Sequence, residues 1–130
     1  MPSGSIMQGS YKVLVPINAV TATTESDAIV IAGAKKITLA FTRANHSAGS
    51  TLFDVDVSLD GTTYVDFAQL ITNVINGITE GKVRVASVSL ASNTTQIVSM
   101  DLDNNAFFTM KVKATETTDG THTITALIEY

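Results

Sequence analysis

The chain has 130 residues, of which 45% are hydrophobic, so it has the usual size of one domain and enough apolar material for one core. It has no cysteine, which excludes disulfides, thiolate metal sites and cysteine nucleophiles. The net charge is -4, and the eight basic residues are scattered, with no run longer than Lys35-Lys36. Because phosphate binding needs clustered Lys and Arg, we expect no nucleic-acid partner. No apolar run approaches the roughly 20 residues of a membrane-spanning helix, so we expect no membrane contact.

The first ten residues, MPSGSIMQGS, are rich in Pro, Gly and Ser. They lack the charged head and apolar core of a signal peptide, so we expect a protein that is made in the cytoplasm. A segment of this composition is typical of a flexible arm that becomes ordered against a neighbouring chain. We therefore divide the chain into an N-terminal arm, residues 1–10, and a single domain, residues 11–130.

Most of the domain alternates apolar and polar residues with period two, which predicts strands with one face on a core. The residues predicted to point inward are Ile37, Leu39 and Phe41; Phe53, Val55, Val57 and Leu59; Val98, Met100 and Leu102; Phe108, Met110, Val112 and Ala114; and Ile124, Ala126 and Ile128. With Phe108 in the core, Phe107 is left to be covered by a partner or by a second sheet. Leu127 lies on the other side of the last segment, which indicates a second apolar face there.

Two irregularities interrupt this pattern. Around Ala86 and Ser87 the alternation slips by one residue, as a β-bulge or a bend between two sheets would produce. Pro16 interrupts the first segment, Tyr11 to Val20, and has no N–H to donate. We therefore expect that segment at a sheet edge.

Turn-forming residues separate the segments, and we interpret them as hairpin-type links. They are Gly33-Ala34, Ser47-Ala48-Gly49-Ser50, Asp60-Gly61, Ser92-Asn93, Asp103-Asn104-Asn105 and Asp119-Gly120. Their spacing, and the abundance of Thr and Val, indicate a sandwich or a closed barrel. Our prediction is an all-β protein, an antiparallel β-sandwich of jelly-roll type with about eight strands.

One segment departs from the period of two. Apolar residues recur at helical spacing between Asp66, an N-cap candidate, and Gly77, a stop candidate. They are Phe67, Leu70, Ile71, Val74, Ile75 and Ile78. The β-branched residues and the two asparagines argue against a helix, and an extended crossover would accommodate them as well. A short helix near residues 67–76 and an extended segment therefore both stay open.

The acidic residues on the outward side of the segment from Phe53 to Leu59 resemble the start of a calcium-binding loop. The string is Asp54, Asp56, Ser58 and Asp60, followed by Gly61. A loop of that kind needs its glycine at the sixth position, whereas Gly61 is at the eighth. We favour a solvated strand face, and leave open whether Asp54 and Asp56 bind an ion. Asp101 and Asp103 precede Asn104-Asn105, and turn chemistry explains them.

Other residues with catalytic or ligand chemistry stand alone. His46 and His122 lie in polar segments without a chelating spacing, and we expect both to be exposed and without a ligand role. The chain has no Gly-x-Ser-x-Gly elbow and no glycine-rich phosphate loop. We assign no catalytic, cofactor-binding or metal-binding residue, and expect a protein that is not an enzyme.

Two stretches carry a resemblance to a known class of proteins. One is Val57-Ser58-Leu59-Asp60-Gly61-Thr62-Thr63-Tyr64-Val65-Asp66-Phe67; the other is Phe108-Thr109-Met110-Lys111-Val112-Lys113-Ala114-Thr115, which leads through Asp119-Gly120-Thr121 to Glu129-Tyr130. Together they resemble small β-sandwich structural proteins of tailed bacteriophages. In those proteins a hairpin containing Ser-Leu-Asp-Gly-Thr precedes a strand of the type aromatic-x-Met/Val-Lys-Val-x-Ala and a Thr-rich final hairpin.

The resemblance implies a virion structural protein, in the first place a capsid decoration or cement protein on the phage head. The implied partner is the major capsid protein or another virion protein, and the implied assembly is a homotrimer. A phage tail or fibre component is an alternative, because such components use similar folds. A carbohydrate-binding β-sandwich module is another, although sugar platforms need exposed Trp or Tyr. The chain has no Trp and three tyrosines, Tyr11, Tyr64 and Tyr130.

Overall fold

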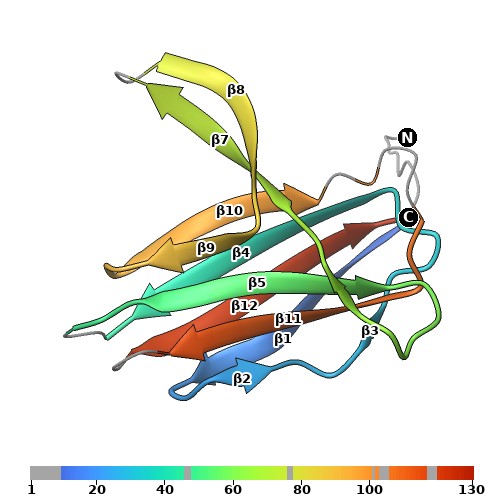
Figure 1. Ribbon diagram of the computed structural model, residues 1–130, viewed down its shortest axis with the longest axis horizontal. Coiled ribbons are helices and arrows are strands. Elements are labelled where there is room, and N and C mark those ends of the chain that lie inside the picture. Colours follow the sequence, from blue (N-terminus) through green and yellow to red (C-terminus); the bar gives the residue numbers. More distant parts are fainter. Residues whose placement is uncertain (1–9, 46–47, 76–77, 101, 103–105, 117–119) are drawn as a thin grey trace, which may run out of the picture.

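Two antiparallel sheets pack against each other (Figure 1). The computed structural model describes residues 10–45, 48–75, 78–100, 102, 106–116 and 120–130. The strands are β1 (Tyr11–Val20), β2 (Thr24–Glu25), β3 (Ile29–Val30), β4 (Lys36–Ala44), β5 (Thr51–Ser58), β6 (Val65–Asp66), β7 (Gln69–Ile75), β8 (Ile78–Val85), β9 (Ser87–Leu90), β10 (Thr94–Met100), β11 (Thr109–Glu116) and β12 (Thr121–Glu129). Eight of them have at least seven residues, which agrees with the predicted number.

The strand order is that of a jelly roll. The first sheet has the order β1-β12-β4-β10-β7-β8. In the second sheet β11 and β5 are central; β2 and β3 both pair with β11, and β6 and β9 both pair with β5. Apart from the steps β2-β3, β5-β6 and β7-β8, the chain changes sheet from one strand to the next, which is jelly-roll connectivity. The predicted β-sandwich is confirmed.

The core lies between β4 and β12 of the first sheet and β5 and β11 of the second. At every second position their side chains are withdrawn from solvent, and these are Ile37, Leu39, Phe41, Phe53, Val55, Val57, Met110, Val112, Ala114, Ile124, Ala126 and Ile128. Phe41 of the first sheet stacks on Phe53 of the second, with ring centroids 4.9 Å apart and planes 5° from parallel. This stack joins the two sheets directly.

Both irregularities of the pattern correspond to features of the sheets. Within the described residues, β1 pairs with β12 alone and is an edge strand, as Pro16 predicts. Two register shifts interrupt this pairing between Leu14 and Val20. Between Val85 and Ser87 the chain leaves β8 of the first sheet and enters β9 of the second, so the slip marks a bend between sheets.

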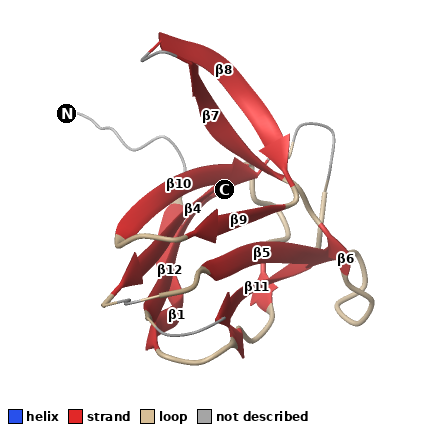
Figure 2. Ribbon diagram, turned by 60° about the vertical axis from the view of Figure 1, so that its left-hand side comes forward, coloured by secondary structure: helices blue, strands red, loops and turns tan. Residues whose placement is uncertain are grey.

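The alternative of a helix near residues 67–76 is wrong. Gln69–Ile75 is strand β7, which pairs with β8 as a hairpin. The β-branched residues Ile71, Thr72, Val74 and Ile75 favour extended backbone, because their χ1 angles are restricted in a helix. β7 reaches β10 only through Gln69 and Leu70, and beyond them the hairpin projects away from both sheets (Figure 2).

Most of the links that were predicted to be hairpins are not hairpins. Among the links with turn residues, only that at Asp60-Gly61 joins two paired strands, β5 and β6. The links at Gly33-Ala34, residues 47–50, Ser92-Asn93, residues 103–105 and Asp119-Gly120 connect strands of different sheets. Turn residues report where a strand ends, and they do not report which sheet receives the next strand.

Two predicted core residues are exposed. Leu59 is 75% exposed because β5 ends at Ser58 and the chain turns there. Phe108 is 44% exposed, since the chain bends before β11 begins at Thr109. Phe107 packs against the core in its place, so the predicted roles of the two phenylalanines are reversed.

Several predictions fall on residues outside the description. They concern residues 1–9 of the arm. They also concern His46, Asp101, Asp103 and Asn104-Asn105. In the described part of the chain, no helix is long and apolar enough to cross a membrane.

The stack between the sheets gives a test of the core. Replacing Phe53 by Ala leaves a cavity against Phe41, and we expect it to lower the free energy of unfolding by about 3–5 kcal/mol. Phe108→Ala removes the same atoms from a partly exposed position and is the matched control, with an expected loss of less than half as much. Urea unfolding followed by circular dichroism measures both, and equal losses would contradict the assigned core.

Candidate functional site

Exposed large apolar side chains form two separate groups on the surface. Tyr11, Val13 and Ile97 lie on the outer side of the first sheet. Leu59 and Val65, with Phe108 and Val30 beside them, lie at the end of the sandwich where β5 turns into β6. Val15 belongs to neither group and lies beside Pro16 in the irregular part of β1. We call the outer side of the first sheet around Val13 and Ile97, with Tyr11 at its border, the sheet face, and the surface of Leu59, Val65, Phe108 and Val30 the turn end.

The sheet face consists of three rows of cross-strand neighbours. In antiparallel sheets, paired residues point to the same side. The rows are Val13, Leu127, Thr38, Ser99 and Leu70; Thr125, Ala40 and Ile97; and Thr123, Thr42 and Thr95. These eleven residues include five threonines, and none is charged.

Side chains on the sheet face are short or apolar, and several are exposed to water. Tyr11 is 58% exposed, Val13 60% and Ile97 55%. One of the hydroxyls of Thr42 and Thr95 donates to the other at 2.9 Å, so the face satisfies part of its own hydrogen-bonding capacity. Charges begin at its borders, where Glu129 pairs with Lys36 and Leu70 pairs with Arg84. Leu127 thus lies on the outer side of the first sheet, between Val13 and Thr38, on a face where apolar side chains and threonines are mixed.

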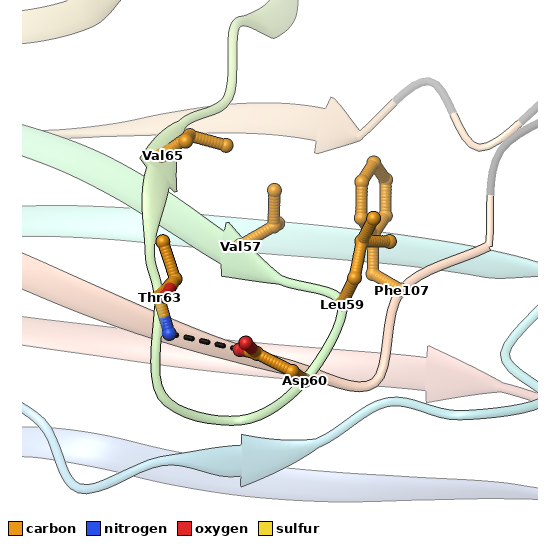
Figure 3. A pocket seen from close by; sticks show the side chains of 6 residues that line it. All are labelled: Val57, Leu59, Asp60, Thr63, Val65 and Phe107. Carbon is orange, nitrogen blue, oxygen red and sulfur yellow. Dashed lines mark hydrogen bonds between the residues drawn. The ribbon is translucent and has the colours of Figure 1, made fainter.

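A hollow of about 390 Å³ opens at the turn end (Figure 3). Its lining is mainly apolar and consists of Val57, Leu59, Val65, Phe107, Asp60 and Thr63. Val57 and Val65 are paired across β5 and β6, and Phe107 packs edge-on against Phe67 with ring centroids 5.2 Å apart. The hollow has the size and composition to receive an apolar side chain or a small apolar ligand.

Asp60 fixes the turn that forms the rim of this hollow. Its Oδ1 accepts backbone N–H groups of Thr62 at 2.9 Å and Thr63 at 2.8 Å, and the hydroxyl of Ser58 at 2.9 Å. These hydrogen bonds hold the pKa of Asp60 well below its usual range. Gly61 follows with φ of +85°, and a Cβ there would approach the Phe108 ring to 3.0 Å. Asp60 is therefore a turn residue, as its position before glycine suggests.

The outer side of the second sheet carries the charges that the sheet face lacks. Asp54 pairs with Lys113 and Asp56 with Lys111, while Asp56 also faces Asp66 of β6. Partial burial raises the pKa of Asp56 to about 6, helped by its hydrogen bond to Asp66 and by the charge of Asp54. Partial burial also raises the pKa of Asp54, and Lys113 opposes this effect. The predicted acidic strand face is present, with its charges partly compensated by lysines.

A buried polar cluster closes the opposite end of the core. Nη1 of Arg43 donates to the carbonyls of Gly49 and Leu90, and Nη2 donates to Ala48. The remaining distances are 3.8 Å from Arg43 Nη2 to Glu116 Oε1, 2.8 Å from His122 Nε2 to Glu116 Oε2, and 3.1 Å from His122 Nδ1 to Thr51 Oγ1. The cluster joins four strands to the loops at this end, which is a stabilising role.

The prediction that His122 is exposed is wrong. The side chain is fully buried, and burial lowers the pKa of its imidazole, with Glu116 opposing and Arg43 adding to the effect. Its position was visible in the period of two, because His122 extends the inward series Ile124, Ala126 and Ile128 by one step. The polar residues around it concealed this.

The described side chains give no further centre of reactivity. Among them, no group of three or more His, Asp or Glu residues is placed to hold a metal ion. Of the three tyrosines, only Tyr11 is exposed; Tyr64 bonds to Thr109 through its hydroxyl at 2.8 Å and lies under the Lys111 ammonium, 4.7 Å away. What the geometry offers is two surfaces with exposed apolar side chains, the sheet face and the turn end.

Comparison with known proteins adds to the fold. A scan against protein-family models finds no match, and a search of curated proteins finds none either. Among solved structures, the chain is similar to the SPBc2 prophage-derived protein YomS, with a TM-score of 0.66 at 12% identity, over 98% of this chain and 100% of that one. The likeness establishes the fold. PirA, with a TM-score of 0.42 at 9% identity over 96% and 97% of the two chains, adds no argument.

Asp56 gives a test by pH. Its pKa of about 6 exceeds the value near 4 of an unfolded aspartate, so the folded state holds the proton more tightly and loses stability as pH rises through about 6. Asp56→Asn removes this loss and keeps a donor toward Asp66. We expect the variant to have a higher urea midpoint than the parent at pH 8 and a much smaller advantage at pH 4. Asp27→Asn, an exposed carboxylate outside this face, should show no such change with pH.

The stabilising role of the buried cluster can be tested by comparing its ion pair with an exposed one. The ion pairs Arg43–Glu116 and Lys111–Glu25 have similar lengths, 3.8 and 3.9 Å, but only the first is buried. Glu116→Gln should lower the free energy of unfolding by about 3 kcal/mol, because it leaves a buried guanidinium without its counter-charge. Glu25→Gln should cost less than about 1 kcal/mol. Urea unfolding at pH 7 compares them, and similar losses would refute a stabilising role for the cluster.

Proposed function

We propose that the protein is a non-enzymatic structural protein of a phage particle, in the first place a decoration or cement protein that binds and stabilises the head surface. The observation that carries the proposal is that its exposed apolar side chains gather in two surfaces of a rigid jelly roll. Concentrated exposed apolar area marks protein-binding surfaces. The proposal excludes catalysis, because these surfaces offer contact area and no set of reacting groups.

The similar structure supports a phage origin. YomS is described as prophage-derived, and it matches this chain over nearly the full length of both. Jelly rolls are also a common architecture of viral capsid proteins. The proposed partner is the major capsid protein or another virion protein, the proposed assembly is a homotrimer, and the proposed location is the virion, after synthesis in the host cytoplasm.

The turn end suits attachment to such a partner. The hollow lined by Leu59, Val65 and Phe107 is concave and apolar, and an apolar side chain of the partner would displace water from it. Its rim is held in place by the hydrogen bonds of Asp60, so little ordering is needed on binding. A tail or fibre position would use the same contacts. Among the described residues, a sugar ligand finds two exposed aromatic rings, Tyr11 and Phe108, and they lie on different surfaces of the sandwich.

Purified phage particles test the proposal. We expect mass spectrometry to find the protein in particles of the phage whose genome encodes it. We also expect labelled antibodies to bind the head of these particles in electron micrographs. Particles that lack the protein should lose their DNA at a lower temperature, and the purified protein should rebind and restore them. Leu59→Lys/Val65→Lys should weaken rebinding at least tenfold, because lysine is strongly hydrated and cannot fill the hollow.

The control for rebinding is Asp54→Asn, which changes the charged face and leaves the turn end intact. Its rebinding should equal that of the parent protein. Antibody label on the tail would replace the head by the tail as the location. Absence of the protein from particles, together with a signal on a glycan array, would replace the virion role by carbohydrate binding.

A further inference from the structure

We propose that the sheet face is the surface through which copies of this chain contact one another. The inference rests on the proposed function and deepens it, since it assigns self-association to one surface and leaves the turn end for another virion protein. The two surfaces lie on different parts of the sandwich, so both can be occupied at once.

Charge distribution favours a second copy as the occupant of the sheet face. Each chain has a net charge of -4, so contact between copies is opposed wherever acidic groups meet. The eleven residues of the sheet face carry no charge, whereas Asp54, Asp56 and Asp66 lie on the outer side of the other sheet. A surface without charges cannot select a different partner by electrostatic complementarity. Contact between two copies of the same uncharged surface does not need electrostatic selection.

The shape and the side chains of the sheet face also favour a second copy as its occupant. The face is a sheet surface of Thr, Ser, Ala, Val, Leu and Ile side chains, and sheet surfaces pack on one another at about 10 Å. Tyr11 lies at its border, 58% exposed, and aromatic residues are enriched in protein interfaces. One hydroxyl of the Thr42–Thr95 pair already donates to the other, so covering the pair leaves one hydroxyl donor to be matched by the partner and not two.

The area is sufficient for association that depends on concentration. Four strands about 4.8 Å apart and three positions along each strand about 6.7 Å apart give roughly 400 Å² per copy, or roughly 800 Å² in total. Stable specific interfaces begin at about 1,200 Å², so this contact is of the weak, transient kind. Copies would thus be separate when dilute and associate when concentrated or when held on a common particle.

The β1 edge of the first sheet is a poorer contact than the sheet face. In β1, Pro16 lacks an N–H, and two register shifts disturb the strand between Leu14 and Val20. Both features prevent another strand from continuing the sheet there. Contact between copies through the face needs no new backbone hydrogen bonds.

Sedimentation of the purified full chain tests the proposal without any virion partner. Between about 5 µM and about 500 µM we expect the mass to rise from 13.7 kDa to a two- or threefold multiple. Val13→Lys/Ile97→Lys should remain at 13.7 kDa throughout, because it places charges on both sides of the contact. Leu59→Lys/Val65→Lys introduces the same charges at exposed apolar positions of the turn end, and should associate like the parent protein.

A second measurement does not depend on added charge. The chain has no cysteine, so Ile97→Cys places a single thiol in the face and Leu59→Cys places one at the turn end. Maleimide should react at least threefold more slowly with Ile97→Cys at the higher concentration and at an unchanged relative rate with Leu59→Cys. A parent protein that stays at 13.7 kDa overturns the inference, as does association that is lost in Leu59→Lys/Val65→Lys and kept in the face variant. Neither result depends on particle binding, so the proposed function can fail or hold separately.

Discussion

The packing of Phe41 on Phe53 joins the two sheets, and the rest of the fold follows from keeping the same side of every central strand turned toward that stack. Each of β4, β5, β11 and β12 contributes three buried apolar residues in alternation. Because a jelly roll changes sheet at almost every link, residues that are close in the core are far apart in the chain. The alternation in each strand must therefore agree with that of strands in the other sheet, and a slip of one residue would turn a whole apolar series to solvent.

The same alternation explains the polar end of the core. One step beyond the apolar residues, the inward position of these four strands is occupied by Arg43, Thr51, Glu116 and His122. They lie at the end where β4 and β11 finish and where β5 and β12 begin, so the topology brings them together. Their contacts to the loop carbonyls of Ala48, Gly49 and Leu90 close this end. At the other end the inward residues are Ile37, Val57, Met110 and Ile128, and the chain bends at Phe108, which leaves a hollow beside Val57.

Much of the fold was predictable, since strand alternation is a local signal. The long strands, the edge position of β1 and the bend at Ala86 all follow from it. The helix alternative arose because the apolar residues of 67–78 also match a spacing of three and four, and only pairing with β8 decides between the two. Leu59 and Phe108 were misplaced because the alternation was extended past the strand ends at Ser58 and Thr109. Pairing across the chain and the exact end of a strand are not encoded in any single segment.

The candidate surfaces were harder to predict than the strands. The sheet face combines residues from β1, β12, β4, β10 and β7, so no stretch of sequence displays it, and Leu127 was its one local sign. Threonine accounts for five of its eleven residues, and its chemistry suits a surface with two states. It favours strands, and its hydroxyl bonds to water in the free protein or to a neighbouring hydroxyl, as in Thr42–Thr95. Lysine or glutamate would keep such a face permanently hydrated, and leucine would make it insoluble when uncovered. A threonine-rich face between these extremes remains compatible with water until a partner covers it.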